Sequence, residues 1–319
     1  MEIALSVLIP TYGRPRELEA TVKCLLPQLQ SGDEIIVVTQ DEDGIIKRED
    51  WPPDGPIRCL RSSPPGLTRA RNLGILQSRN PFGIFLDDDI IPAPDLLSRF
   101  RLAIASRPNA VWTGKIIQTD RPREATLADR TSPFPGYVDL KSGTIVTDYG
   151  DPPPGPMPFF AGGLCSLPLH KLGHYPWYSP RFRGSALGEE IDLALRLRTL
   201  GIEILCDPTI SMIHLKAPHG GCRSVDYQRR SADDEAFNRA YFWGLHGEYR
   251  GLPAFARRMR SFLEFHARQK APRWLRHHPR IVLKMSLLVL WGFGSGCIDR
   301  WGRKFFPAGD LIKPGRESQ

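Results

Sequence analysis

The stretch that decides the fold reads Phe82–Gly83–Ile84–Phe85–Leu86–Asp87–Asp88–Asp89, an apolar run that ends in three consecutive carboxylates. Ile90–Ile91–Pro92 follows it directly, and this apolar setting predicts a buried strand with an acidic C-terminal end. Carboxylates crowded at the end of a buried strand repel one another unless a cation offsets their charge. We therefore expect a metal site at this edge.

The acidic edge favours a hard divalent cation. Carboxylate oxygens suit Mg²⁺ or Mn²⁺, which commonly bridge a protein to substrate phosphates. Side chains alternate along a strand, so Asp87 and Asp89 are expected to share the ion while Asp88 points elsewhere. The alternative is an acidic turn ahead of a helix, because Pro92–Ala93–Pro94–Asp95 has the composition of a helix start.

Around this edge, apolar runs of strand length alternate with helical patterns, which predicts an α/β fold with a mixed, mainly parallel sheet flanked by helices. The expected strands are 3–10, 34–39, 57–60, 82–86, 111–117 and 202–206. The expected helices are 15–29, 67–77, 94–104 and 188–200. The proline-rich residues 120–160 are expected to form a loop at the rim of the site, near Gly162–Gly163.

Polar clusters follow three of the expected strands. They are Thr11–Tyr12–Gly13–Arg14, Gln40–Asp41–Glu42–Asp43 and Asp87–Asp88–Asp89. Ligands of open α/β sheets bind outside the carboxyl ends of the strands, so one crevice is expected to collect all three clusters.

Four segments, taken in order, resemble glycosyltransferase family 2, whose members have the GT-A fold and use nucleotide sugars. The segments are Ser6–Arg14, Gly66–Ile75, Phe85–Asp89 and Gly188–Leu197, and the resemblance covers about residues 3–215. It implies that Pro10, Thr11, Tyr12 and Arg14 hold the nucleotide and that Arg71 lies near the diphosphate, where a guanidinium suits phosphate oxygens.

The same resemblance implies that Asp87 faces the ribose or the metal, that Asp88 contacts substrate, and that Asp89 ligates the metal. His214, after the extended segment Ile210–Ile213, would complete the metal site or contact the diphosphate. A hydrogen-bonded structural role is the alternative for this histidine. Family members commonly have an acidic residue directly after the second strand, whereas Thr39–Gln40 precede Asp41 here, so the base-contacting carboxylate is Asp41 or is absent.

The resemblance makes Glu190 the catalytic base, which takes the proton of the acceptor hydroxyl. This chain has Glu where the family more usually has Asp, so Glu189, also expected to contact substrate, or Asp192 could share the role. A general base works near its operating pH, so we expect a raised pKa for Glu190. The plain alternatives are first-turn carboxylates favoured by the helix dipole, and an Asp192–Arg196 ion pair four residues apart.

The 319-residue chain has a formal net charge of +8, and this charge is concentrated near its C-terminus. Residues 247–319 hold fifteen Lys/Arg against five Asp/Glu. Cations and aromatic residues interleave over 257–306, which predicts binding to an anionic membrane surface. The apolar residues 281–298 are expected to form an interfacial or re-entrant helix, with packing on the catalytic domain as the alternative. No recognition module supports nucleic-acid binding.

Six scattered cysteines show no zinc or disulfide spacing, and the N-terminus lacks a secretory pattern, so a cytoplasmic protein on the membrane face is expected. The expected domains are a GT-A domain over 1–245 and a basic helical tail over 246–319. The resulting hypothesis is a metal-assisted, inverting glycosyltransferase acting on a lipid-linked or polysaccharide acceptor. The rivals are a nucleotidyltransferase, which would show a glycine-rich phosphate loop, and a catalytically silent nucleotide-sugar binder.

Overall fold

Strands and helices alternate along the first half of the chain, as predicted. The computed structural model describes residues 3–41, 55–118, 136–139, 144–147, 149–172, 177–221, 225–247 and 279–305. The elements up to the acidic edge are β1 (Leu5–Thr11), α1 (Pro15–Leu25), η1 (Leu26–Gln28), β2 (Glu34–Thr39), β3 (Ile57–Arg61), α2 (Leu67–Gln77) and β4 (Phe82–Leu86). Those that follow are β5 (Ile90–Pro92), α3 (Leu96–Ser106), β6 (Val111–Gln118), β9 (Gly155–Pro156), β10 (Leu164–Pro168), α5 (Leu169–Leu172), α6 (Glu189–Thr199) and β11 (Ile204–His214).

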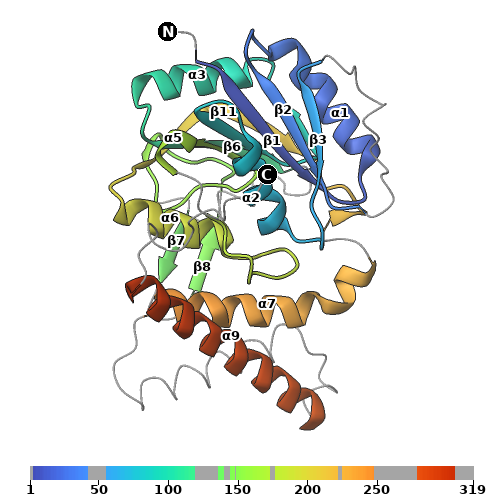
Figure 1. The fold of residues 1–319 in the computed structure, drawn as a ribbon, viewed down its shortest axis with the longest axis vertical. Coiled ribbons are helices and arrows are strands. Elements are labelled where there is room, and N and C mark those ends of the chain that lie inside the picture. The colour runs from blue at the N-terminus through green and yellow to red at the C-terminus, as the bar shows by residue number, and fades with distance from the viewer. Residues whose placement is uncertain are drawn as a thin grey trace, which may run out of the picture. The chain divides into compact units, whose positions relative to one another are not determined.

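These strands form one mixed sheet in the order β3-β2-β1-β4-β10-β6-β11-β5, with β9 beside β11 (Figure 1). β3, β2, β1 and β4 run parallel, so their carboxyl ends share one edge. β10 enters antiparallel between β4 and β6, and β11 runs parallel to β6. The parallel half therefore brings Thr11, Thr39 and Leu86, and the loops after them, to the same side of the molecule.

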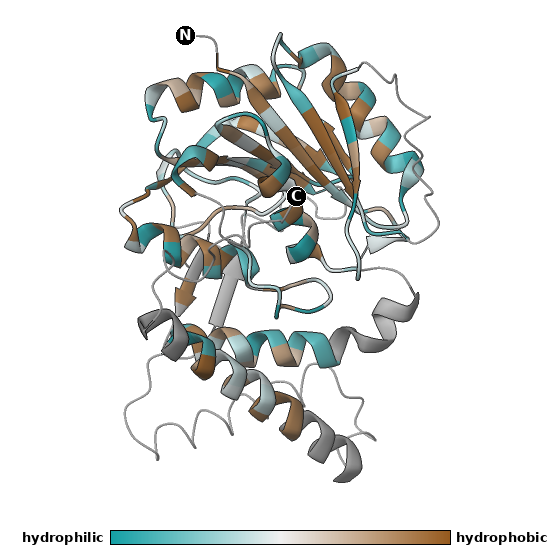
Figure 2. Cartoon of the chain, in the orientation of Figure 1, coloured by the Kyte–Doolittle hydropathy of each residue, from teal (hydrophilic) through white to brown (hydrophobic). Residues whose placement is uncertain are grey.

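Helices cover both faces of the sheet. Alternate residues of β1, among them Val7 and Ile9, are buried in one cluster with apolar residues of α1 and α3. On the other face, α2 packs against β1 and β2, with Gly74 facing the side chains of Leu8 and Val38. Figure 2 shows hydrophobic residues concentrated along the central strands. Burial on both faces explains why these strands read as continuous apolar runs.

Residues 120–160 are not simply a loop, which corrects the sequence expectation. β7 (Gly136–Asp139) and β8 (Thr144–Thr147) form a two-stranded sheet, and Gly155–Pro156 pairs with β11. The strand-forming residues Tyr137–Val138 and Ile145–Val146 favour extended structure despite the nearby prolines. Residues 119–135, 140–143 and 148 lie outside the described part of the chain.

α7 (Val225–His246) was not predicted, because its sequence has no single apolar stripe. α9 (Pro279–Phe305) contains the apolar stretch 281–298 that was expected to be helical. The chain divides into two compact units, residues 1–138 with 145–229, and residues 139–144 with 230–319. Among the helices that the structure describes, none is long and apolar enough to cross a membrane.

Candidate active site

The three acidic residues in the bend after β4 differ in how deeply they are buried. Asp87 is half-buried, whereas Asp88 and Asp89 are buried. The N–H of Asp87 donates to the carbonyl of Gly163, 3.3 Å away, in the tight turn that leads into β10. A Cβ on Gly163 would lie 2.1 Å from Asp87 Oδ2, so only glycine leaves room for this carboxylate in its present position.

Asp87, Asp89 and His214 form a three-donor cluster. One ligand atom from each, two carboxylate oxygens and an imidazole nitrogen, lies within 4.8 Å of the other two. His214 reaches the edge because β11 pairs with β5 in antiparallel register, with His214 opposite Ile90. This oxygen and nitrogen set suits Mn²⁺ or Mg²⁺ and gives the cluster the donors that a divalent cation needs.

Hydrogen bonds hold Asp89 in its ionised form. His214 Nε2 lies 3.1 Å from Asp89 Oδ1, and the Ala217 N–H donates to Asp89 Oδ2 at 2.8 Å. Burial on its own would raise the pKa of Asp89, but the hydrogen bond from His214 and the charge of Arg14 outweigh it, so this pKa lies below 3.8. Asp89 is therefore an anionic donor at neutral pH.

Asp88 is not part of the cluster, as predicted, but the three acidic residues lie in a bend and not in a strand, and Arg14 Nη1 also lies 3.2 Å from Asp89 Oδ2. Thr11 Oγ1 donates to Asp88 Oδ2 at 2.7 Å, and Arg14 Nη1 lies 2.8 Å from Asp88 Oδ1. Burial raises the pKa of Asp88 to about 6, although Arg14 pulls it down. Arg14 also donates to the carbonyl of His219, so it ties the first loop to the segment after β11.

Gln40 and Asp41, which directly follow β2, have different hydrogen-bond partners. The Gly13 N–H donates one bifurcated hydrogen bond to Asp41, at 3.0 Å from Oδ1 and 3.1 Å from Oδ2, which holds the loop after β1 in place. Gln40 accepts a hydrogen bond from the Gly66 N–H at 2.8 Å and donates to the carbonyl of Thr11. Of these two side chains, Gln40 lines the pocket described below and Asp41 does not.

Arg71, Glu189 and Glu190 lie where α2 meets the start of α6. The Arg71 guanidinium forms an ion pair with Glu189 and stacks over the ring of Tyr178, 5.4 Å from its centroid. Both charged side chains are buried, so this pair is shielded from water. A Cβ on Gly162 would lie 2.8 Å from Arg71 Nη1 and Nη2, which shows how closely the turn before β10 follows the guanidinium.

Glu190 is the next residue of α6 and is half-buried. Burial raises its pKa above 4.5, its own backbone N–H and the charge of Arg71 oppose the rise, and Asp87 adds to it. The pKa of Glu190 therefore responds to the charges of both Arg71 and Asp87. Burial is the largest cause of the raised pKa values of Tyr149 and Tyr178, and the charge of Glu190 raises both further. The predicted Asp192–Arg196 ion pair is present, at 3.0 Å.

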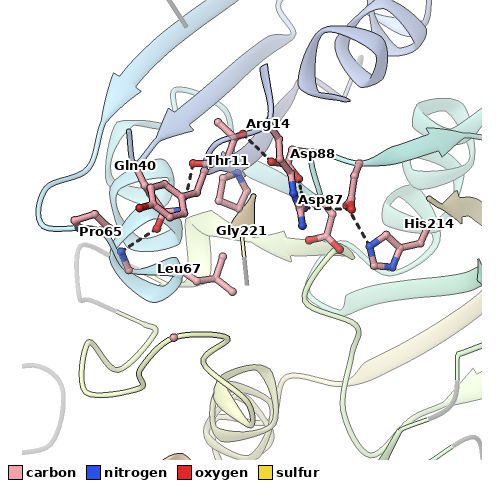
Figure 3. Close-up of a pocket in the computed structure, with 14 residues that line it drawn as sticks. Thr11, Arg14, Gln40, Pro65, Leu67, Asp87, Asp88, His214 and Gly221 are labelled. Carbon is pink, nitrogen blue, oxygen red and sulfur yellow. Dashed lines mark hydrogen bonds and ion pairs between the residues drawn. The ribbon is translucent and has the colours of Figure 1, made fainter. Parts of the chain in front are cut away.

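A pocket of about 280 Å³ opens at this edge of the sheet (Figure 3). Eight of the predicted residues line it: Pro10, Thr11, Tyr12, Arg14, Asp87, Asp88, Asp89 and His214. The other predicted residues, Asp41, Arg71, Glu189 and Glu190, do not line it. The other six lining residues were not predicted as individual site residues: Gln40, Pro65, Gly66, Leu67, Gly184 and Gly221. Gln40 belongs to the polar cluster after β2 that was expected to reach this crevice.

Comparisons with known proteins agree with this architecture. Residues 6–159 match the family model described as "Glycosyl transferase family 2". An uncharacterized glycosyltransferase of Haemophilus influenzae is 27% identical over 107 residues, which cover 33% of this chain and 36% of that protein. The matched segment therefore spans about a third of the relative's length.

Solved structures share the fold at low sequence identity. GalNAc-T7, crystallised with UDP, GalNAc and Mn²⁺, superposes with a TM-score of 0.54 at 15% identity, over 87% of this chain and 58% of that one. S. aureus TarS 1–349 superposes with a TM-score of 0.54 at 12% identity, over 94% of this chain and 92% of that one. Residues 6–159 are thus similar in sequence to glycosyl transferase family 2, and the chain shares the GT-A fold of these solved structures.

Proposed function

We propose that this chain is an inverting glycosyltransferase that moves a sugar from a nucleoside diphosphate to a hydroxyl of a lipid-linked or polysaccharide acceptor. The observation that carries the proposal is the Asp87–Asp89–His214 cluster in a pocket at the strand ends, with Glu190 electrostatically coupled to Asp87. Asp87 thus belongs to the cluster suited to a diphosphate, and its charge also raises the pKa of the candidate base, Glu190.

The donor side of the proposal rests on the pocket. Thr11, Tyr12 and Gln40 lie on the part of the wall formed by the first two strand ends, and Asp87, Asp89 and His214 lie on the part formed by β4 and β11. A divalent cation held by these last three residues would offset the negative charge that develops on the departing nucleoside diphosphate. GalNAc-T7, which shares the fold, was crystallised with UDP and Mn²⁺, the same two ligand classes.

Glu190 is proposed as the general base. Its carboxylate accepts the proton of the acceptor hydroxyl while the hydroxyl oxygen forms a bond to the anomeric carbon. The bond from that carbon to the diphosphate breaks, and the leaving group keeps the electron pair. A single displacement of this kind inverts the anomeric configuration. The raised pKa of Glu190 favours proton uptake near neutral pH.

Arg71 is proposed to act through Glu189 and not as part of the pocket wall. The buried ion pair anchors the first residue of α6 to α2, and Glu190 is the next residue along the helix. Glu189 Oε2 and Arg71 Nε are buried without a hydrogen-bond partner among the described residues, so both keep capacity to bond substrate or water. This arrangement limits the motion of Glu190 relative to Asp87.

Peripheral association with a membrane is part of the proposal, because residues 247–319 carry fifteen basic and five acidic side chains. Within the basic segment 257–306, the structure describes α9 (Pro279–Phe305), and residues 257–278 and 306 lie outside the described residues.

The test begins with a screen of nucleotide sugars for Mn²⁺-dependent thermal stabilisation, because a ligand of the folded state raises the melting temperature. With the donor identified, Glu190→Gln should lower the rate of transfer at least about 100-fold while donor affinity stays close to that of the parent protein. Glu19→Gln, on the exposed side of α1, is the matched control and should leave transfer unchanged.

Each rival predicts a different result. Retained turnover in Glu190→Gln would remove Glu190 as the base. Donor binding without transfer or donor hydrolysis in the parent protein would point to a silent binder. Release of pyrophosphate from a nucleoside triphosphate would point to a nucleotidyltransferase.

A further inference from the structure

One side of α9 packs tightly on α7. A Cβ on Gly292 would lie 2.6 Å from the carbonyl oxygen of Phe237, and one on Gly296 would lie 2.2 Å from that of Tyr241. The Tyr241 hydroxyl donates to Asp299 Oδ2 at 2.6 Å. Backbone contacts this close require glycine on the packed side, so the rotation of α9 about its own axis is defined relative to α7.

The opposite side of α9 presents an apolar row to solvent. Leu287, Leu290, Trp291 and Ile298 are exposed by 57%, 51%, 56% and 66% respectively, and we call them the α9 row. A Cβ on Gly294 would meet no atom within 4 Å, so this glycine also faces open space. Spacings of three, four and seven residues put the row on one helix face. Figure 2 shows apolar residues along the described part of this helix.

The charges of α9 indicate what this face contacts. The sequence of α9 contains the cations Arg280, Lys284, Arg300, Arg303 and Lys304, and Arg300 donates a hydrogen bond to the carbonyl of Gly247 at 2.9 Å. Its one acidic residue in the sequence, Asp299, is hydrogen-bonded to Tyr241. A second copy of this helix would bring like charges together, whereas anionic headgroups would complement them.

We propose that the α9 row docks the protein on an anionic lipid bilayer, with the helix lying in the plane of the interface. Leu287, Leu290, Ile298 and the exposed part of Trp291, whose ring also packs edge-on against Phe237, would enter the headgroup boundary. The net positive charge of the α9 sequence would favour anionic lipids. No described helix can cross a bilayer, which agrees with a helix that lies on the surface. The inference rests on the membrane association proposed above and names the surface that would make it, but not on sugar transfer, since lipid binding is measured without donor or acceptor.

The test uses the full-length protein and sedimentation with vesicles. The protein should sediment with vesicles of phosphatidylcholine and phosphatidylserine, and much less with phosphatidylcholine alone or at high salt. The double variant Leu287→Glu/Leu290→Glu should weaken this binding at least about tenfold, because two apolar groups are lost and two negative charges are added. Both residues are more than half exposed, so the fold should tolerate the change.

Leu102→Glu is the matched control. Leu102 lies on α3 with 66% of its surface exposed and is not part of the α9 row, so this substitution should leave lipid binding unchanged. Thermal unfolding checks that each variant is folded. The proposal is overturned if the parent protein does not bind the mixed vesicles, or if the folded double variant binds as tightly as the parent. It is also overturned if the parent is a dimer that the double variant converts to a monomer, since a second copy would then cover the row.

Discussion

The neighbouring carboxylates Asp87, Asp88 and Asp89 differ in role although they are chemically identical. Asp88 accepts a hydrogen bond from Thr11 and forms an ion pair with Arg14, whereas Asp87 and Asp89 share a cluster with His214. The three residues lie in the bend between β4 and β5, and the partners that surround this bend determine which carboxylate joins the cluster. At the start of α6, Glu189 is paired with Arg71, and Glu190 is coupled to Asp87.

Glu190 should make stability depend on pH. Its pKa is raised in the folded state, so the stability it contributes is present below the ordinary glutamate pKa and is lost as the pH rises through the folded value. Glu190→Gln removes this loss, so the variant should melt at a higher temperature than the parent at neutral pH. The difference should shrink toward zero in acid. A melting-temperature difference that does not change with pH would contradict the burial of this carboxylate.

The Arg71–Glu189 ion pair should show strong coupling. Arg71→Met leaves a buried carboxylate without its cation and should cost about 3–5 kcal/mol of unfolding free energy. Arg71→Met/Glu189→Gln should recover much of that loss, because no buried charge remains. Urea unfolding of the single and double variants gives the coupling energy. The exposed Arg99–Asp95 pair is the control, and its coupling should stay below about 0.5 kcal/mol. Equal coupling in the two pairs would refute the burial argument.

At the scale of elements, glycine marks the places where backbone must approach closely. The turn of Gly162 and Gly163 before β10 leaves room for Arg71 and Asp87. At both positions a side chain would occupy space that another group already fills. The position of a functional side chain is therefore set partly by residues that carry no side chain.

Two glycines of α9 offer a matched pair of substitutions. Gly296→Ala would place its Cβ 2.2 Å from a backbone oxygen of α7, so it should lower unfolding free energy by about 1–3 kcal/mol. Gly294→Ala faces open space and should raise it by up to about 1 kcal/mol, because alanine favours helix. Urea unfolding or protease resistance of residues 230–319 measures both effects. Shifts of the same sign would contradict the observed packing of α9 on α7.

At the scale of the whole molecule, the candidate metal site is assembled by topology. Asp89 and His214 lie 125 residues apart in the sequence and meet because β11 pairs with β5. The segment after β11 is then tied back to the first loop, since Arg14 donates to His219 and the Gly221 N–H donates to Tyr12. Correct folding of the sheet is thus a condition for metal binding.

Metal binding should depend on His214 but not on His219. His214→Ala removes one of the three donors and should weaken Mn²⁺ affinity at least about tenfold. His219→Ala is the control, because this side chain is 64% exposed and contacts Glu17 instead of the cluster. The measurement is the Mn²⁺-dependent rise in melting temperature, with no nucleotide present. Equal responses of the two variants would exclude His214 as a ligand.

Local pattern in the sequence was enough for much of the fold. The helix at Leu67–Gln77 and the strands at Glu34–Thr39 and Phe82–Leu86 agree with prediction at both ends, because each is a continuous apolar or periodic run bounded by turn residues. The acidic edge was also predicted, because three carboxylates after a buried strand need charge compensation. α7 was missed, since it lacks an apolar stripe and is identified only by its packing on α9.

The sequence by itself determined the α/β class and the acidic strand end, since these follow from local periodicity and charge. Only the tertiary structure decided that Arg71 pairs with Glu189, that Gln40 and not Asp41 lines the pocket, and that one side of α9 is exposed. These outcomes depend on contacts between segments far apart in the chain. Local periodicity carries no information on which distant backbone fills the space beside a given side chain.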